Sequence, residues 1–524
     1  MMNTVKETII IPTVGLGSRM GEISNHLNKA LLPYKNKPIL SHIIDAFPDD
    51  TSIIIPIGYL AQQIKDYCGL VYPNRDITFV SVSDWTSEKS GTAHTLLHCT
   101  GYVSGPFWYI PCDTYFSDDT LLQQDRNENC FYIEDKPSST PELYTMFEIA
   151  DNRISGLKFK EVAPSTYRAF TGLMYIHEYA EFFETLSASG KNEFIYVIQS
   201  GSRTELLPSW KDFGNYENYI NENKTTDYDF SKPEEITYVG TKSIIKWWKD
   251  PITAKQKYEK TQAKPNLYPS DVSYAGQFLY YTKIAGTTLY DDPNISMKFT
   301  KLLAWLDTDV WEQVPVDISS SALTFYKAKS LSRIDLFLKN HKNLVPPRVV
   351  DGVDVKDYSY YLDKIDWQYL ADTAVPTHIH GDLQFDNIIS STDDEFFLID
   401  WRHNFADQTA LGDLYYDLSK LLGGLIIQYS EIKANNFDVA VSNNGLDVTL
   451  AVPTHPQIKQ FVSELHDFVL ARNLDFEKVQ MIVPIIFWNM APLHNPPFDT
   501  FLWYLGLKLF AELDGGKNEI YKPE

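Results

Sequence analysis

The chain has 524 residues, more than one hydrophobic core usually serves, so two or three domains are expected. Hydrophobic residues make up 44% of it and charged residues 22%, the composition of a globular protein with ample apolar material to bury. The 46 basic and 69 acidic residues give a net charge of −23. That charge argues against nucleic acid and anionic membrane surfaces as partners, because both need neutralising Lys and Arg side chains.

The cysteines and the apolar segments predict where the protein works. Its four cysteines lie in the first quarter of the chain without CxxC spacing, which predicts neither a disulfide framework nor a zinc site. The first twelve residues hold no apolar run long enough for a signal peptide. The stretch 479–493 is too short to span a bilayer and predicts a buried helix. We expect a cytoplasmic protein without membrane insertion; its oligomeric state stays open, a homodimer included.

Strand-like and helix-like segments alternate over the first 110 residues. Short β-branched or aromatic runs predict strands at 7–12, 51–58, 77–82 and 107–112, and helical spacing predicts helices at 37–47 and 60–67. This alternation predicts an α/β domain with a Rossmann-like, mostly parallel sheet and helices on both faces. In such a sheet, ligands bind at the carboxyl ends of the strands.

A polar, charged segment at 221–235 divides the sequence. We expect a first domain at 1–224, a linker at 225–235 and a second domain at 236–524. The second domain begins with a predicted strand–turn–strand at 236–249, a helix at 253–261 and a strand at 277–284. From Met297 onward the pattern is mainly helical.

A glycine-containing loop follows the first strand. Gly15 and Gly17, with Ser18 beside them, let the backbone turn tightly and present N–H groups to an anion. Arg19 and Lys29 add positive charge for phosphates. By itself, a GxG pattern is better explained by a plain turn.

In combination with later segments, this loop resembles the sugar-phosphate and phosphocholine nucleotidyltransferase family. The resemblance rests on GLGSRM at 15–20, Lys29, LLP at 31–33 and KPIL at 37–40, and it covers roughly the first 220 residues. Asn28 stands where the family usually has Pro, and Thr13–Val14 stand where small residues are common. The segment 90–96, which contains Gly91 and Thr92, resembles the part of the family that contacts the nucleotide base.

The same resemblance implies a magnesium site and a reaction. Asp113, just past a predicted strand, and Asp212, in WKDFGNYENY at 210–219, correspond to the family's two Mg²⁺ ligands. Outside such motifs, aspartates are commonly surface or helix-capping residues. Lys160 would lie beside the acceptor phosphate; a solvated lysine on a strand face is the alternative. The implied reaction is attack of a substrate phosphate on the α-phosphorus of a nucleoside triphosphate, with CTP the first expectation and UTP the next.

A second motif lies at 377–401. His380, Asp382 and Asn387 have the spacing of the catalytic loop of protein kinases, in which the Asp accepts the proton of the attacking hydroxyl and the Asn binds Mg²⁺. Asp400 ends the next predicted strand, where the main Mg²⁺ ligand of kinases stands. Gly381 after the His and Ile-Asp-Trp at 399–401 resemble the aminoglycoside phosphotransferase and choline kinase family. A structural His–Asp turn explains the shared spacing, order and strand placement less well.

This second resemblance implies a kinase-like, two-lobed α+β domain that uses ATP and Mg²⁺. Lys246, in SIIK at 243–246, would hold the ATP phosphates, and Glu259 on the next helix would pair with it. An ordinary amphipathic helix explains Glu259 equally well. Segment 277–286 resembles the hinge that binds adenine. Asp413 and Asp417 are interpreted as structural residues.

The two halves together predict consecutive reactions on one small molecule. ATP would phosphorylate a hydroxyl compound, and CTP or UTP would then convert the phosphate into a nucleoside-diphosphate-activated precursor for surface glycan or lipid decoration. Choline or another amino alcohol, a polyol and a sugar all stay open as the compound. A rival hypothesis makes the N-terminal half a nucleotide-sensing module that controls a small-molecule kinase.

Overall fold

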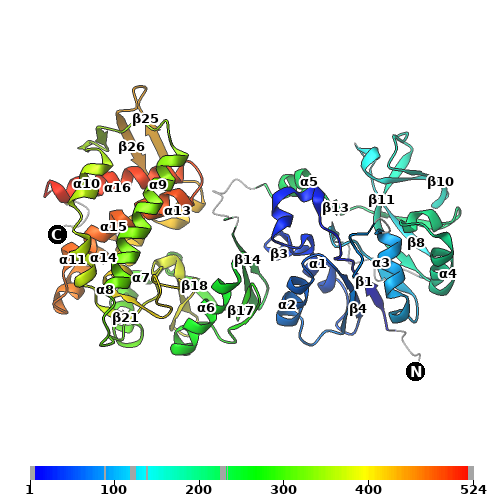
Figure 1. Cartoon of the computed structure of the whole chain (residues 1–524), viewed down its shortest axis with the longest axis horizontal. Helices are drawn as coiled ribbons and strands as arrows, with labels where there is room; N and C mark the ends of the chain where they lie inside the picture. The colour runs from blue at the N-terminus through cyan, green and yellow to red at the C-terminus, as the bar shows by residue number, and fades with distance from the viewer. Residues whose placement is uncertain are drawn as a thin grey trace. The chain divides into compact units, whose positions relative to one another are not determined.

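The chain forms two compact units in a computed structural model that describes residues 6–87, 90–117, 126–136, 138, 140–224, 232 and 234–516 (Figure 1). The first unit comprises Met1–Lys224, Thr237–Gly240 and Ala275–Phe278, and the second comprises Thr225–Ile236, Thr241–Tyr274 and Leu279–Glu524. Within the expected linker at 225–235, residues 225–231 and 233 lie outside the described part.

The first unit is built around a nine-stranded sheet with the strand order β5-β4-β1-β6-β11-β8-β12-β10-β9. The first four strands are parallel neighbours, as the alternating pattern predicts. Beyond β6 the sheet is mixed: β11 is antiparallel to β6 and β8, while β12 is parallel to β8. In order along the chain, the strands are β1 (Thr8–Ile10), β4 (Ser52–Ile57), β5 (Ile77–Ser81), β6 (Phe107–Tyr109), β8 (Cys130–Glu134), β9 (Thr145–Ala150), β10 (Arg153–Phe159), β11 (Tyr167–Ile176) and β12 (Arg203–Leu207).

The expectation of a mostly parallel sheet is therefore wrong for the second half of this sheet. Strands β9 and β10 are joined only by Asp151 and Asn152, which have φ angles of 51° and 59°. Such a two-residue turn forces its strands to run antiparallel, whereas parallel strands need a long crossover connection.

Helices of the first unit pack on the sheet through large apolar side chains. They are α1 (Ile39–Asp45), α2 (Ala61–Val71), α3 (Thr92–Cys99), α4 (Tyr179–Ser189) and α5 (Tyr216–Glu222). Leu96 of α3 and Phe182 of α4 share one buried core with Phe107, Phe131 and Phe147 of the strands. This core holds α3 beside the carboxyl ends of the parallel strands.

Three strands and a helix follow along the chain at the expected places, together with a fourth strand, β16, that the sequence pattern does not indicate. The strands form a sheet in the order β14-β15-β17-β16, and α6 (Pro251–Ala263) lies between β15 and β16 in sequence. Their bounds are β14 (Glu235–Val239), β15 (Ser243–Trp248), β16 (Ser273–Ala275) and β17 (Phe278–Thr282).

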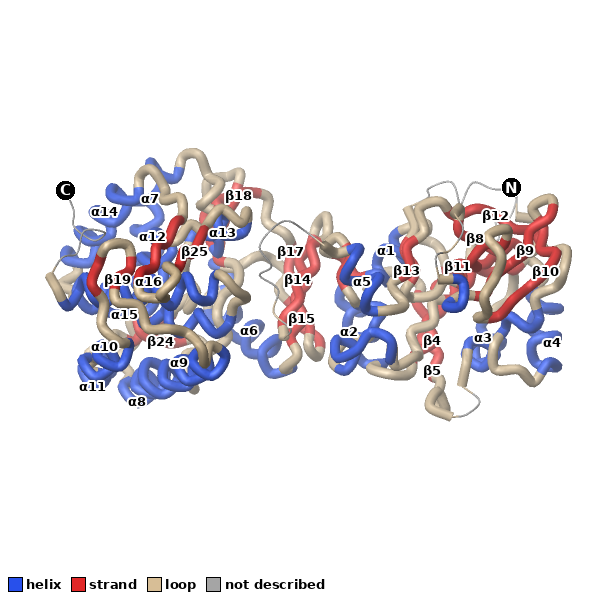
Figure 2. Tube along the Cα trace, turned by 90° about the horizontal axis from the view of Figure 1, so that it is seen from above, coloured by secondary structure: helices blue, strands red, loops and turns tan. Residues whose placement is uncertain are grey.

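Helices dominate the rest of the second unit, as the pattern after Met297 predicts (Figure 2). They are α7 (Ile295–Trp305), α8 (Ser319–Leu323), α9 (Lys329–Asn340), α10 (Tyr358–Lys364), α11 (Trp367–Asp372), α12 (Leu414–Ile426), α13 (Tyr429–Lys433), α14 (Ile458–Ala471), α15 (Phe476–Met490) and α16 (Phe498–Asp514). Helix α15 is buried along nearly its whole length and corresponds to the apolar stretch at 479–493. None of the helices in the described part is long and apolar enough to cross a membrane.

Short strands accompany these helices, and three of them, β21, β22 and β23, lie at the kinase-like motif at 377–401. Strands β22 (Ile388–Ser391) and β23 (Phe396–Leu398) form a hairpin next to β18 (Gly286–Thr288), and β21 (Pro376–His378) pairs with β24 (Leu411–Asp413). A further sheet with the order β20-β19-β26-β25, which the sequence pattern does not indicate, consists of β19 (Val349–Val350), β20 (Val353–Asp354), β25 (Asp438–Val441) and β26 (Asp447–Ala451).

Candidate functional sites

A cavity of about 480 Å³ lies at the carboxyl ends of β1 and β6 in the first unit. Most of the residues that the sequence assigns to the nucleotide site line it: Gly15, Arg19, Lys29, Gly91, Thr92, Asp113, Lys160 and Asp212. Gly17 and Ser18 are outside this lining. Gly17 has a φ of 66° and starts the turn that leads to Arg19, so it shapes the loop instead of facing the cavity.

Strand pairing brings the two expected metal ligands together. In the antiparallel pair of β7 (Thr114–Tyr115) and β13 (Lys211–Asp212), Thr114 lies opposite Asp212. The backbone N–H of Phe213 also donates to the carbonyl oxygen of Asp113 at 2.8 Å. A Cβ built on Gly214 would lie 2.8 Å from Asp212 Oδ1 and 3.3 Å from both Asp113 Oδ2 and Arg19 Nη2. Both carboxylates and the Arg19 guanidinium therefore surround one point.

The electrostatics of this pair suit a divalent cation. Lys29 Nζ donates to Asp113 Oδ2 at 2.7 Å, and although burial opposes it, this ammonium holds the pKa of Asp113 below its ordinary value. Burial and the charge of Asp113 raise the pKa of Asp212, although Tyr144 Oη donates to Asp212 at 2.9 Å. A carboxylate whose charge is disfavoured by its neighbour is stabilised when a cation is shared between them, and Mg²⁺ prefers such oxygen ligands. The residues present thus fit the implied metal.

Asn28, where the family usually has Pro, fixes Lys29 in place. Its side chain is fully buried, accepts from the backbone N–H of Ala30 at 3.0 Å and donates to the carbonyl oxygens of Thr13 and Tyr59 at 3.0 and 2.8 Å. Because Thr13 follows β1, these bonds tie the lysine of the site to a strand of the sheet. Hydrogen bonds of Asn28 thus hold this turn, where a proline would restrict it through its ring.

The segment expected to contact the base packs closely against the backbone of Asn192. A Cβ on Gly91 would lie 2.3 Å from the carbonyl oxygen of Asn192, which accepts from the N–H of Ala93 at 2.8 Å. Thr92 Oγ1 donates to Glu193 Oε2 at 2.6 Å. Glu193 and Tyr144 both line the cavity and were not singled out from the sequence, because each lies far along the chain from the recognisable motifs.

Lys160 lies at the cavity but makes no ion pair within the described residues. It has a φ of 52°, its backbone N–H donates to the carbonyl oxygen of Tyr144 at 3.0 Å, and its Nζ lies 5.0 Å from the centre of the Phe159 ring. Its ammonium is exposed and its assignment to the acceptor phosphate stays a prediction.

In the second unit, the kinase-like loop forms a hydrogen-bonded turn around Asp382. Asn387 Nδ2 donates to the carbonyl oxygen of Asp382 at 2.8 Å and to its Oδ2 at 3.3 Å. Lys420 of α12 places its Nζ 2.6 Å from Asp382 Oδ1. Although burial opposes it, the Lys420 charge holds the pKa of Asp382 well below its ordinary value, so the carboxylate stays ionised.

Buried polar groups connect this turn to the segment after β23 that carries Asp400. His380 Nε2 donates to the carbonyl oxygen of Ile399 at 2.8 Å, while its Nδ1 accepts from the N–H of Asp382 at 3.1 Å. Asp417 accepts from the N–H groups of His380 and Gly381, each at 2.7 Å. The arrangement fixes Asp382 relative to Asp400 without either side chain having to bond the other.

The expected pair of Lys246 and Glu259 is not formed. Lys246 contacts Asp400 Oδ1 and lies 3.6 Å from Glu235 Oε1, whereas the half-exposed Glu259 lies 3.6 Å from Lys255 on the same helix. Lys257 and Lys260 occupy the buried face of α6, and a residue two positions after Lys257 points to the opposite side of an α-helix. The charge of Asp400 outweighs burial and raises the pKa of Lys246.

Lys257 and Lys260 are buried lysines that the sequence motifs do not indicate. Lys260 Nζ donates to the carbonyl oxygens of His380 and Arg402 at 3.2 and 3.0 Å, and Lys257 Nζ donates to that of Trp401. Burial lowers the pKa of Lys257 to about 8 and that of Lys260 to about 7. They fasten α6 to the segment that carries Asp400.

Comparison with known proteins gives relatives for the N-terminal part. No family model matches the chain. The bifunctional protein GlmU of Methanococcus vannielii is 26% identical over 215 residues, which cover 39% of this chain and 49% of GlmU. The UTP–glucose-1-phosphate uridylyltransferase AglF of Haloferax volcanii is 24% identical over 133 residues, covering 24% of this chain and 53% of AglF. The chain thus spans about half the length of these curated relatives.

Solved structures with a likeness to this part include two nucleotide-processing enzymes. The CTP:phosphocholine cytidylyltransferase LicC of Streptococcus pneumoniae shares 15% identity, with a TM-score of 0.35 over 41% of this chain and 97% of LicC. A UDP-glucose pyrophosphorylase bound to UDP-glucose shares 18% identity, with a TM-score of 0.35 over 42% of this chain and 97% of its own. The sequence matches alone make the N-terminal part of the chain similar to GlmU and to a uridylyltransferase.

Proposed function

We propose that the chain is a bifunctional enzyme. Its second unit phosphorylates a small hydroxyl compound with ATP, and its first unit transfers a nucleotidyl group, from CTP first and UTP next, onto the resulting phosphate. The product is a nucleoside-diphosphate-activated precursor for surface glycan or lipid decoration. The observation that carries the proposal is the grouping of Lys29, Asp113 and Asp212 in one cavity of a unit whose relatives include a uridylyltransferase.

In the first unit, an oxygen of the substrate phosphate bonds to the α-phosphorus of the nucleoside triphosphate as the bond to the pyrophosphate oxygen breaks. The attacking phosphate is already ionised near neutral pH, so no general base is required, and positioning with charge neutralisation supplies the rate. Arg19 and Lys29 carry the positive charge at the cavity. Asp113 and Asp212 would hold Mg²⁺, which supplies further neutralisation of phosphate charge.

In the second unit, the acceptor hydroxyl gives its proton to Asp382 as its oxygen bonds to the γ-phosphorus of ATP, and ADP leaves. Lys420 keeps Asp382 ionised before the reaction. Asn387 and Asp400 would hold Mg²⁺ beside the phosphates. Lys246 would exchange its contact with Asp400 for the phosphates of ATP, since one ammonium can serve either set of oxygens.

Substitution of single aspartates separates the two activities. We expect Asp113→Asn and Asp212→Asn to slow pyrophosphate release from the supplied phosphate and nucleoside triphosphate at least about 100-fold, with ATP-dependent phosphorylation retained. Asp382→Asn reverses the pattern, slowing phosphorylation by about 100- to 10,000-fold. Asp393→Asn, an exposed aspartate between β22 and β23, is the matched control and leaves both rates unchanged. Pyrophosphate release that survives both changes in the first unit contradicts its metal assignment.

The rival function predicts a different outcome for the same variants. If the first unit only sensed nucleotides, the wild-type chain would release no pyrophosphate, and Asp113→Asn would alter how nucleotides control the kinase. Mass spectrometry of mixtures containing ATP, Mg²⁺, each nucleoside triphosphate and a panel of amino alcohols, polyols, sugars and hydroxy acids tests both hypotheses. A nucleoside-diphosphate conjugate formed only when ATP is present supports the consecutive reactions.

Positive charge around Asp382 narrows the class of acceptor. Lys329 Nζ lies 3.8 Å and Arg402 Cζ 5.1 Å from the centre of the same Phe325 ring. Lys329 also lies 5.6 Å from the ring centre of Tyr416, one helical turn before Lys420 on α12. Arg402 packs on the residue before Asp382, because a Cβ on Gly381 would lie 2.7 Å from Arg402 Cβ.

This group of basic side chains favours an acceptor that carries an anionic group, such as a hydroxy acid or an acidic sugar, over choline, because an anion would restore the positive charge that burial and Arg402 disfavour on Lys329. Within the described residues no carboxylate pairs with Lys329 or Arg402, and burial and Arg402 lower the pKa of Lys329. A cationic acceptor would add positive charge next to Lys329 and Arg402, whereas an anionic acceptor would reduce the repulsion between these basic side chains.

A lysine substitution tests this acceptor class. We expect Lys329→Met to raise the KM for an anionic acceptor about tenfold or more while the KM for ATP stays constant, because one lost ion contact costs over about 1 kcal/mol in a partly buried site. Lys327→Met, at an exposed position two residues earlier, is the control. A raised KM for ATP alone would assign Lys329 to the ATP phosphates and remove the argument for an anionic acceptor.

A further inference from the structure

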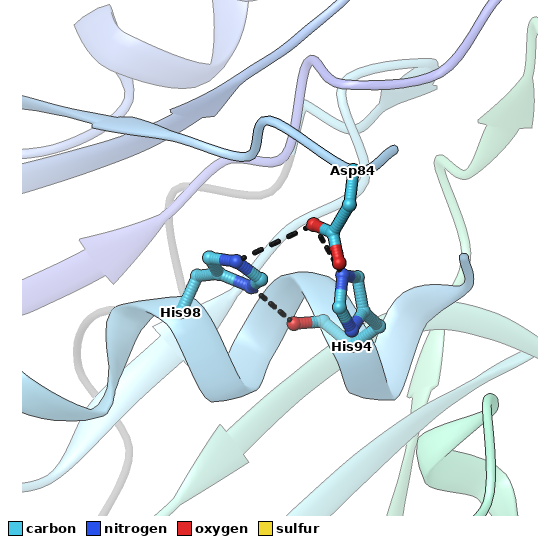
Figure 3. Close-up of side chains that lie close together, drawn as sticks. All are labelled: Asp84, His94 and His98. Carbon is cyan, nitrogen blue, oxygen red and sulfur yellow. Dashed lines mark hydrogen bonds and ion pairs between the residues drawn. The ribbon is translucent and has the colours of Figure 1, made fainter. Parts of the chain in front are cut away.

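Three side chains of types that can bind a metal, Asp84, His94 and His98, meet in the first unit (Figure 3). His94 and His98 lie one turn apart on α3, and Asp84 follows β5. Asp84 Oδ1 lies 2.8 Å from His94 Nε2 and 3.6 Å from His98 Nε2, and one ligand atom from each residue lies within 4.8 Å of the others. All three side chains remain accessible to solvent.

The hydrogen bonding of His98 leaves a lone pair aimed at this group. His98 Nδ1 lies 2.9 Å from the backbone carbonyl oxygen of His94, and because a carbonyl can only accept, Nδ1 carries the proton. In the neutral ring, Nε2 is then an acceptor that faces the Asp84 carboxylate, another acceptor. Metal-bound histidines commonly have this arrangement, with the second ring nitrogen donating to a carbonyl oxygen that fixes the tautomer and the ring direction.

We infer that Asp84, His94 and His98 form a binding site for a divalent transition-metal ion of the Zn²⁺ type. Two imidazole nitrogens and one carboxylate oxygen suit Zn²⁺, and three protein ligands leave a fourth position for water or another group. The site differs in chemistry from Asp113 and Asp212, whose oxygen-only set suits Mg²⁺.

The position of this site links it to the nucleotide cavity. His94 and Trp85, the neighbour of Asp84, both line the cavity, and α3 begins at Thr92 in the expected base-contacting segment. An ion held by the three ligands would join the residues after β5 to α3 at the edge of the cavity. The inference goes beyond the proposed function and does not depend on it, since metal uptake is measured without turnover.

Zinc binding to the full chain tests the site. The protein is freed of metal with a chelator and titrated with Zn²⁺ in a large excess of Mg²⁺ by calorimetry, and Co²⁺ is added in parallel to record its visible absorption. We expect one tight equivalent of Zn²⁺ and a tetrahedral Co²⁺ spectrum. His98→Ala and the nearly isosteric Asp84→Asn each weaken Zn²⁺ binding more than about 100-fold and abolish that spectrum.

Controls separate this outcome from adventitious binding and from misfolding. His466→Ala removes a histidine of the second unit that contacts Asp467 at 3.2 Å without a third ligand in the described part, and it leaves the tight equivalent in place. Equal unfolding midpoints of the metal-free variants and the wild type show that folding is retained. The inference is overturned if the wild type takes up no Zn²⁺ in excess Mg²⁺, or if His98→Ala and Asp84→Asn bind as tightly as the wild type.

Discussion

At the scale of single residues, the buried side chain of Asn28 makes hydrogen bonds to three backbone groups around the cavity loop. It serves the backbone on both sides of the cavity loop, because its amide donates to two carbonyl oxygens while its oxygen caps the turn that holds Lys29. Proline at this position would rigidify the same turn through its ring but could make none of these bonds.

Asn28→Ala is expected to lower the free energy of unfolding of the first unit by about 2–4 kcal/mol, because it leaves several buried backbone groups without partners. The matched control is Asn25→Ala, an exposed asparagine three residues earlier, which changes stability by less than about 0.5 kcal/mol. Denaturant unfolding of both variants checks the difference. Equal stability would mean that water replaces the lost bonds and that the amide only fills space.

Sequence motifs located residues that act through short local patterns and missed those that act from elsewhere. Asp113, Asp212, Asp382 and Asp400 could be placed because each directly follows or ends a recognisable strand or loop. Tyr144 could not, because its hydrogen bond to Asp212 joins residues 68 positions apart. Glu259 was assigned to Lys246 from its place on the following helix, but helix phase, which the buried Lys257 and Lys260 set, turns it outward.

At the scale of secondary-structure elements, the start of α3 depends on contact with the segment around Asn192. Gly91 has an extended φ of 167°, which any residue adopts. Glycine is therefore needed at this position because there is no space for a side chain, and not because of the backbone conformation. The carbonyl oxygen of Asn192 occupies the position that a Cβ would take.

Gly91→Ala is expected to displace α3 from this segment, lower the free energy of unfolding by about 1–3 kcal/mol and raise the KM for the nucleoside triphosphate. Gly101→Ala is the matched control in the same region, since a Cβ there meets nothing within 4 Å. Kinetics of nucleotidyl transfer and thermal unfolding of both variants measure the two effects. An unchanged KM in a destabilised Gly91→Ala protein would contradict the role of this segment in nucleotide binding.

Local periodicity predicted individual elements well and their pairing less well. The strands and helices predicted over the first 110 residues lie within a few positions of the observed ones, because each is a distinct apolar run, whereas helix α3 is not among the predicted elements. The mixed half of the sheet depends on which strand meets which, and β12 pairs with β8 across more than 60 residues of sequence. The sheet containing β19 and β26 was missed for the same reason, since its strands are short and distant in sequence.

At the scale of the whole molecule, buried neutral histidines are concentrated in the second unit. Burial lowers the pKa of His378 to about 3 and that of His380 to about 4, and it lowers those of His403 and His494 to about 4 and 3. In the unfolded chain each of these rings would titrate near 6.5. The unfolded state therefore binds more protons than the folded state between these values.

The second unit is expected to lose stability as the pH falls below about 6.5. A group whose folded pKa is depressed stabilises the fold above its unfolded pKa and loses that contribution as the pH falls toward its folded pKa. Each such histidine thus removes up to about 1.4 kcal/mol of unfolding free energy per pH unit in this window. Calorimetric unfolding of the full chain between pH 7.5 and pH 5 should show the transition of the second unit moving to lower temperature faster than that of the first.

A variant that lacks one of these histidines tests whether they are the groups that take up protons on unfolding. His378 is 4% exposed and lies 3.2 Å from the hydroxyl of Tyr268, so His378→Gln keeps a polar side chain at that position but cannot titrate. This variant begins less stable at neutral pH, yet its unfolding temperature falls less steeply with pH, because one proton fewer is taken up on unfolding. Identical slopes in the variant and the wild type would mean that His378 does not contribute to the sensitivity of the second unit to acid.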